Sequence, residues 1–196
     1  MLSTLSTLKT RLAIDEFNVE FDELLTNALD AISARFDQAC NRTFARAENI
    51  THEFAGDDLE LMPPCYPIET VIKFELKENE TEGWVEQTDV VFLMRRACIV
   101  SLQTPFSLLH SSLSIARITY TGGYVLPGTE PAEGQTALPP DIEQAAIEQV
   151  ASWFQNRDKL GLDTVWFHGG VYEKFSKLDL LLPVRATLKK YERWSI

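Results

Sequence analysis

The sequence lacks the features that would mark a membrane-bound, secreted or disulfide-stabilised protein. Its 196 residues contain no apolar run near the roughly 18 residues that a helix needs to span a bilayer. Residues 1–10 lack the basic start and apolar block of a signal peptide. The three cysteines, odd in number and widely spaced, favour buried thiols over a disulfide framework. We therefore expect a protein without a membrane partner that is made and assembled in a cytoplasm.

Catalytic and metal-binding motifs are also missing. The sequence contains no GxSxG, Walker, HExxH or GxGxxG motif. His52, His110 and His168 are distant in sequence from one another and from any cysteine at ligand spacing, which favours surface or hydrogen-bonded histidines. The acidic stretches at residues 57–60 and 78–82 lack the spacing of a calcium loop and fit solvated turns. We expect no enzymatic activity, no cofactor and no bound metal.

Basic residues are scarce, and their distribution is uneven. Lys and Arg total 18 against 29 Asp and Glu, a net charge of -11, which argues against a surface that grips phosphates. Residues 157–196 carry eight basic and five acidic side chains, so this tail has a net charge of +3 and residues 1–156 have -14. The acidic body is either a solvated surface that aids solubility or a surface that repels nucleic acid. The basic tail would then dock on an acidic partner.

Apolar residues recur at helical spacing in three segments. A short helix is predicted to start at Ser3 or Thr4 and to run through Leu12. From residue 20 an apolar stripe predicts a helix of about six turns. Its members are Phe21, Leu24, Leu25, Ala28, Leu29, Ile32, Phe36 and Cys40. Residues 139–157 begin with Pro-Pro-Asp and predict a second long helix that packs on the first, with Trp153 and Phe154 in the core.

The middle and the end of the chain follow other patterns. Alternation of apolar and polar residues predicts strands at residues 50–54, 71–76, 84–87, 90–94, 98–102 and 114–120. The Pro-rich residues 62–68 predict an extended connector or a sheet edge. Residues 125–137 contain two prolines and two glycines, which indicates a long surface loop that serves contacts. A last helix is predicted at residues 184–194.

These elements predict an α+β fold, an antiparallel helical bundle with an inserted antiparallel β region and a C-terminal docking helix. We expect a single domain over residues 1–196. Its parts are a helical body (1–43 and 138–160), a β insertion (44–124), a surface loop (125–137) and a C-terminal docking tail (161–196).

The order of these parts is itself characteristic. It is carried by residues 21–36, by Cys-Asn-Arg-Thr-Phe at 40–44, by the connector at 61–68, by Ala-Arg-Ile-Thr-Tyr-Thr-Gly-Gly-Tyr at 116–124, and by the helix start at 138–150. In this combination the chain resembles the head-tail connector (adaptor, head-completion) proteins of tailed phages. The resemblance spans nearly the whole chain.

The resemblance implies a structural virion protein of the neck, at the interface of head and tail. Its subunits would form a ring, typically of about twelve copies, beneath the portal protein. That ring would extend the DNA channel and give a platform for a stopper or tail-completion protein. DNA would pass through without sequence-specific binding, which agrees with an acidic body because phosphate contacts would slow its sliding.

Two sets of residues are candidate contacts in such an assembly. C-terminal segments of the family commonly dock on the portal, and the basic tail supplies Arg185, Lys189, Lys190, Tyr191, Arg193 and Trp194. The surface loop supplies candidates for an inter-subunit or tail-side contact, namely Val125, Leu126, Pro127 and Thr129.

Three alternatives remain open. One is another neck or tail-completion ring protein, which differs in the partner that it captures. A second is a small phage hydrolase or lysis-associated enzyme, supported only by the supply of Glu, Asp and His. A third is a cytoplasmic regulator or nucleic-acid binder, which conflicts with a sequence pI of about 4.7.

A ring closes through two different patches on each subunit, and loops that order only in the assembly suit such a joint. We therefore predict that the free subunit is monomeric or weakly associated and that the ring forms on the portal. Light scattering of the purified chain measures this directly. A stable closed ring without portal present would contradict the prediction.

Overall fold

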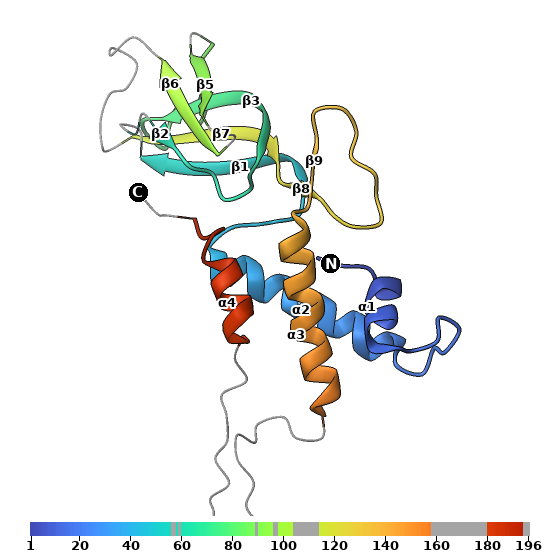
Figure 1. Ribbon diagram of the computed structural model, residues 1–196. Coiled ribbons are helices and arrows are strands. Elements are labelled where there is room, and N and C mark those ends of the chain that lie inside the picture. Colours follow the sequence, from blue (N-terminus) through green and yellow to red (C-terminus); the bar gives the residue numbers. More distant parts are fainter. Residues whose placement is uncertain are drawn as a thin grey trace, which may run out of the picture. The chain divides into compact units, whose positions relative to one another are not determined.

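The computed structural model describes residues 1–55, 58, 60–88, 90–95, 98–103, 114–157 and 180–193. Predictions that concern His110, His168, Trp194 and residues 161–179 of the docking tail lie outside these residues. The described residues confirm an α+β fold with four helices and antiparallel sheets (Figure 1). They form two compact units, Met1–Cys40 with Pro139–Glu192 and Asn41–Leu138 with Arg193–Ile196. We call these the helical unit and the strand unit.

The first two helices of the helical unit lie where the sequence predicts them. Helix α1 (Leu5–Leu12) begins after Thr4, whose hydroxyl accepts a hydrogen bond from the backbone N–H of Thr7 at 3.2 Å. Helix α2 (Asp22–Cys40) buries one side of the predicted stripe. The buried side chains are Leu25, Leu29, Ile32, Phe36 and Cys40.

Helices α3 (Pro140–Gln155) and α4 (Leu182–Leu188) complete the helical unit. Pro140 occupies the first turn of α3, as predicted, because a proline there loses no helical hydrogen bond. Helix α4 is shorter than the predicted helix at 184–194. It ends at Leu188, after which the N–H groups of Lys190 and Tyr191 bond three residues back in tight turns.

Helices α2 and α3 contact each other, and each also contacts α1 and α4, but the four helices do not form the predicted antiparallel bundle. Figure 1 shows α2 running across α3 and α4. Short loops favour antiparallel neighbours, whereas α2 and α3 are separated in sequence by the whole of residues 41–138.

The described residues of the strand unit form two antiparallel sheets and one parallel pair. The four-stranded sheet has the order β1 (Ala47–Ala55), β7 (Ile115–Gly122), β3 (Ile68–Lys77), β4 (Val85–Glu86). The three-stranded sheet has the order β2 (Glu60–Leu61), β6 (Ile99–Gln103), β5 (Val91–Arg95). The parallel pair is β8 (Tyr124–Val125) with β9 (Thr136–Ala137). The six predicted strand segments are confirmed, and the short strand β2 and the parallel pair are additions.

The two antiparallel sheets share one core. Phe74, Ile118 and Tyr120 of the larger sheet pack in the same cluster as Val100 and Leu102 of the smaller one. The hydroxyl of Tyr120 is buried there and accepts a hydrogen bond from the backbone N–H of Cys65 at 3.1 Å. Burial raises the pKa of Tyr120 to about 12, so its hydroxyl stays protonated at neutral pH.

The Pro-rich connector at 62–68 is not helical, and Cys65 within it forms a parallel bridge with Thr43. Its carbonyl oxygens accept hydrogen bonds from other parts of the strand unit. The N–H of Thr43 donates to Pro64 at 2.9 Å, and the N–H of Gly123 donates to Pro67 at 2.9 Å. The guanidinium of Arg42 donates to the Tyr66 carbonyl and lies over the Tyr66 ring. Gly123 has φ +104°, and a Cβ there would meet the Ala45 carbonyl at 2.6 Å, so only glycine fits.

Tyr120→Phe is predicted to lower the free energy of unfolding by about 1–3 kcal/mol, because it leaves the buried N–H of Cys65 without an acceptor. Urea denaturation followed by circular dichroism measures the loss. The matched control is Tyr124→Phe, at a half-buried ring that stacks on Phe44, with an expected change within about 0.5 kcal/mol. Equal effects of the two variants would contradict the assignment.

Candidate functional site

The described residues contain no candidate metal site. No set of three or more His, Cys, Asp or Glu side chains among them could hold a metal ion. His52 is half-buried, and burial together with the charge of Arg193 lowers its pKa, so it is neutral at pH 7. None of the described helices has both the length and the apolar character to cross a membrane.

The three cysteines carry free thiols, and the predicted burial holds for two of them. Cys40 and Cys65 are buried, whereas Cys98 is half-buried. Cys98 directly precedes β6 of the smaller sheet.

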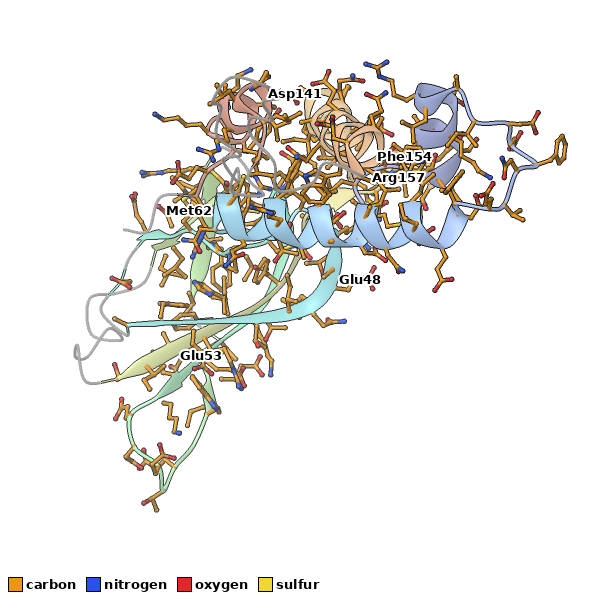
Figure 2. The ribbon with its side chains drawn as sticks, turned by 90° about the horizontal axis from the view of Figure 1, so that it is seen from below. Glu48, Glu53, Met62, Asp141, Phe154 and Arg157 are labelled. Atoms are coloured by element: carbon orange, nitrogen blue, oxygen red, sulfur yellow. The ribbon has the colours of Figure 1, made fainter. Side chains whose placement is uncertain are left out.

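The predicted portal-docking residues separate into two groups. Arg185, Lys189 and Lys190 are exposed on α4 and just beyond it. The hydroxyl of Tyr191 instead donates to Asp141 Oδ1 of α3 at 2.7 Å (Figure 2 labels Asp141). Tyr191 therefore contributes to the packing of the helical unit.

Arg193 also makes an internal contact. Its guanidinium donates to the carbonyl oxygens of Asn41 at 2.8 Å and Met62 at 2.7 Å, all within the strand unit. Met62 belongs to the Pro-rich connector, so Arg193 satisfies one more of its acceptors. Trp194 lies outside the described residues.

Helix α4 is held on α3 by apolar and polar contacts. Val184 and Leu188 are buried. Gln149 of α3 is buried too, and its side-chain oxygen accepts the backbone N–H of Leu181 at 2.8 Å. These contacts fix the start of α4, and its basic residues are consequently presented from a defined position in the helical unit.

The predicted contact loop has a closed base and an exposed tip. Val125 is only 8% exposed because it pairs with Ala137 in the β8–β9 pair, and its carbonyl accepts the N–H of Leu138. Leu126 and Pro127 are half-buried, and Thr129 is exposed. Of the four candidates, Thr129 is therefore the most accessible to a partner.

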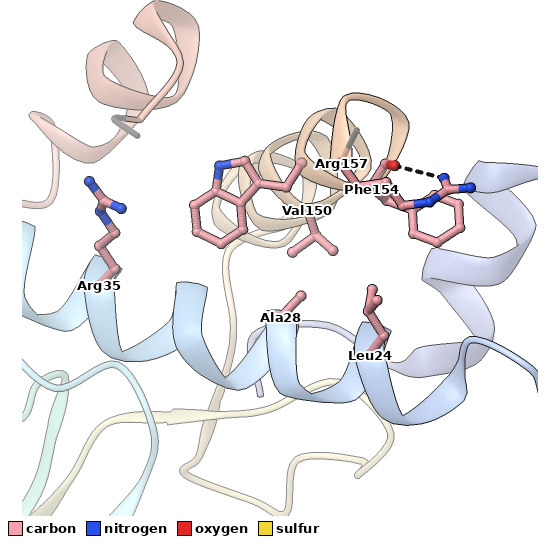
Figure 3. A pocket seen from close by; sticks show the side chains of 7 residues that line it. Leu24, Ala28, Arg35, Val150, Phe154 and Arg157 are labelled. Carbon is pink, nitrogen blue, oxygen red and sulfur yellow. Dashed lines mark hydrogen bonds between the residues drawn. The ribbon is translucent and has the colours of Figure 1, made fainter. Parts of the chain in front are cut away.

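An apolar pocket between α2 and α3 was not expected from the sequence. It has a volume of about 340 Å³ and lies within the helical unit (Figure 3). We call it the α2–α3 groove. Its lining residues are Leu24, Ala28, Arg35, Val150, Trp153, Phe154 and Arg157.

The groove overturns three sequence-based assignments. Trp153 and Phe154 were predicted to be core but are half-buried in the groove wall, and Leu24 of the apolar stripe is 46% exposed. Periodicity identifies the face that a helix turns toward its neighbours, but not how far along the helix those neighbours extend. The adjacent aromatic pair at 153–154, near the end of α3, was the signal available in the sequence.

Comparisons with known proteins find the fold but no sequence relative. No protein-family model matches the chain, and no curated protein matches it. A chain in the neck of an empty gene transfer agent (GTA) particle, computed with C6 symmetry, matches with a TM-score of 0.57 and 13% identity over 97% of this chain and 89% of that one.

Two further solved structures match over the same share of this chain. A chain of the virion of the native GTA particle gives a TM-score of 0.56 at 15% identity, covering 97% of this chain and 89% of the other. A chain of the native GTA neck, computed with C12 symmetry, gives 0.53 at 15% identity, covering 97% and 91%. At these identities the matches show a shared fold.

Tyr191→Phe is predicted to lower the free energy of unfolding by about 0.5–1.5 kcal/mol, because it removes the hydrogen bond to Asp141. Lys190→Ala, at the neighbouring exposed position, should change it by less than about 0.5 kcal/mol. Chemical denaturation of both variants tests the division of the tail into packed and exposed residues. A larger loss for Lys190→Ala would reverse it.

Proposed function

We propose that the chain is a structural, non-catalytic subunit of the neck of a tailed phage or phage-like particle. In this role it is a head-tail connector that forms a ring beneath the portal protein, extends the DNA channel and provides the platform for a stopper or tail protein. The observation that carries the proposal is the fold, which chains of GTA necks share over 97% of this chain.

The symmetry of the related structures supports the ring. The GTA necks were computed with C6 and with C12 symmetry, so the chains within them recur around an axis. A cyclic ring needs a contact between two different patches of adjacent subunits. We propose about twelve copies, in line with the C12 symmetry of the native GTA neck and with the family resemblance.

The charge of the chain suits a channel. With a net charge of -11 the subunit carries an excess of groups that repel phosphates. Each phosphate contact would add affinity and slow the passage of DNA. A ring of acidic subunits therefore lets DNA pass without holding it.

The exposed basic residues of α4 are the proposed docking surface for the portal. Arg185, Lys189 and Lys190 lie at the surface while the buried Val184 and Leu188 anchor the same helix. A rigidly held cluster of positive charge favours an acidic patch on a partner, chiefly through faster association and correct orientation. In this view α4 is the C-terminal docking helix.

A second neck role rests on the same observation. Another neck or tail-completion ring protein would show the same fold match, because the matched chains are identified only as parts of the GTA neck and of the GTA virion. Mixing the chain separately with portal and with tail-tube components distinguishes the two roles. Capture by the portal supports the connector, and capture by tail components alone supports the alternative.

Arg185→Glu combined with Lys189→Glu is predicted to leave a folded subunit that binds its portal at least about tenfold more weakly, because two attractive contacts become repulsive. Co-purification with the portal, followed by electron microscopy of the complexes, measures ring formation.

Two controls separate docking from general effects of charge. The charge-conserving exchange Arg185→Lys with Lys189→Arg should still dock, and so should Arg11→Glu, a reversal at an exposed position on α1. Normal docking of the doubly reversed variant would show that α4 is not the docking surface. Absence of any complex between the unaltered chain and portal would refute the connector role itself.

A further inference from the structure

Two surfaces of the helical unit take no part in the contacts described so far. One is the α2–α3 groove. The other is the loop of residues 13–21 between α1 and α2, which projects away from the other helices in Figure 1. We call it the α1–α2 loop. The two surfaces complement each other in shape and charge.

The α1–α2 loop presents two large apolar side chains to solvent. Phe17 is 91% exposed and Val19 is 73% exposed. Each isolated apolar side chain is unremarkable on a protein surface, but two on one projecting loop form a compact apolar tip. Both are flanked by exposed carboxylates, those of Asp15, Glu16 and Glu20.

Hydrogen bonds fix the conformation of this loop. The carboxylate of Asp15 accepts the N–H of Phe17 at 2.9 Å, and the side-chain oxygen of Asn18 accepts the N–H of Glu20 at 3.0 Å. The N–H of Asn18 also donates to the Asp15 carbonyl at 3.0 Å. The apolar tip is therefore held in place before any partner arrives, which lowers the entropic cost of binding.

A buried lysine secures the base of the loop. Lys9 of α1 is only 3% exposed, and its ammonium group lies 2.6 Å from Asp22 Oδ1. The same group donates to the Glu16 carbonyl at 2.9 Å. Lys9 thus ties the middle of the loop to the first residue of α2.

The groove has the opposite charge at its edge. Its floor and walls are apolar, while Arg35 and Arg157 contribute guanidinium groups to the lining (Figure 3). The Arg157 guanidinium stacks 4.7 Å from the centre of the Phe154 ring and donates to the Phe154 carbonyl. An apolar tip with acidic flanks therefore meets an apolar hollow with basic flanks.

The volume of the groove matches the tip. A cavity of about 150 Å³ holds one benzene ring. With about 340 Å³ the groove has room for the phenyl ring of Phe17 together with the side chain of Val19. Since Phe17 is almost fully exposed in its own chain, it is free to enter the groove of another.

We propose that the α1–α2 loop of one copy inserts Phe17 and Val19 into the α2–α3 groove of a second copy. The contact joins two different patches, so it repeats from subunit to subunit in the manner that ring closure needs. The contact is therefore the subunit interface of the proposed ring, and this inference rests on the proposed function. Carboxylates of the loop and guanidinium groups of the groove orient the two copies.

Two single substitutions test the contact from its two sides. Phe17→Asp removes the apolar tip, and Leu24→Asp places a charge in the groove; both positions are exposed, so the fold should persist. Sedimentation velocity of the full chain up to about 1 mM should show concentration-dependent association, weakened at least about tenfold by either substitution. Leu182→Asp, at a 79% exposed position on α4, is the matched control and should associate like the unaltered chain.

Mixing the two variants gives the sharper result. A Phe17→Asp chain keeps its groove and a Leu24→Asp chain keeps its loop, so one productive contact remains between them. The mixture should form 1:1 dimers and nothing larger. Each variant alone should stay monomeric.

Three outcomes would overturn the proposed contact. The first is the absence of self-association by the unaltered chain at about 1 mM. The second is self-association that Phe17→Asp leaves unchanged, which would mean that the copies associate through a different surface. The third is a Leu24→Asp variant that loses stability as a monomer, which would mean that the groove is filled from within its own chain.

Portal capture separates this contact from the proposed function. If the loop–groove contact is not found but the chain still binds the portal, only the proposed subunit contact is overturned. Self-association through loop and groove, without portal capture, would support the joint and refute the connector role.

Discussion

The strand unit depends on satisfying the carbonyl oxygens of a proline-rich connector. Prolines at 63, 64 and 67 bring no N–H groups, so this segment cannot join a sheet ladder as a full partner. Its carbonyl groups instead accept donors from residues 42–43, from Gly123 and from Arg193. These donors lie at the start of the unit, just after β7 and at its C-terminal end, so one segment joins three parts of the unit that are distant in sequence.

The described residues of the basic tail differ in what they contact. Arg193 is engaged with backbone oxygens, and Tyr191 is engaged with Asp141, so both stabilise the subunit. Among the described residues of the tail, Arg185 is exposed on α4, whose apolar side is buried, and Lys189 and Lys190 are exposed just beyond the end of that helix. A small number of well-positioned charges gives orientation at an interface more effectively than a long unstructured basic segment, because less entropy is lost on binding.

The sequence predicted the long helices and the strands because their periodicity extends over many residues. It failed where the outcome depends on distant partners. The end of α4 is set by turns beyond Leu188 and by the contact of Tyr191 with α3, neither of which has a local signal. The exposure of Leu24 and Trp153 follows from how α2 and α3 cross, and a stripe of apolar residues does not encode a crossing geometry. The fixed conformation of the loop that carries Phe17 depends on a lysine in another helix.

The parallel pair of β8 and β9 has a consequence for how such proteins vary. The pair joins residues 124–125 to 136–137, so the two ends of the intervening segment are held together independently of what lies between them. Lengthening a loop whose ends are already fixed costs little, because the closure entropy grows only with the logarithm of its length. We therefore expect the segment from 126 to 135 to tolerate the gain or loss of residues while the β8–β9 pair keeps its register.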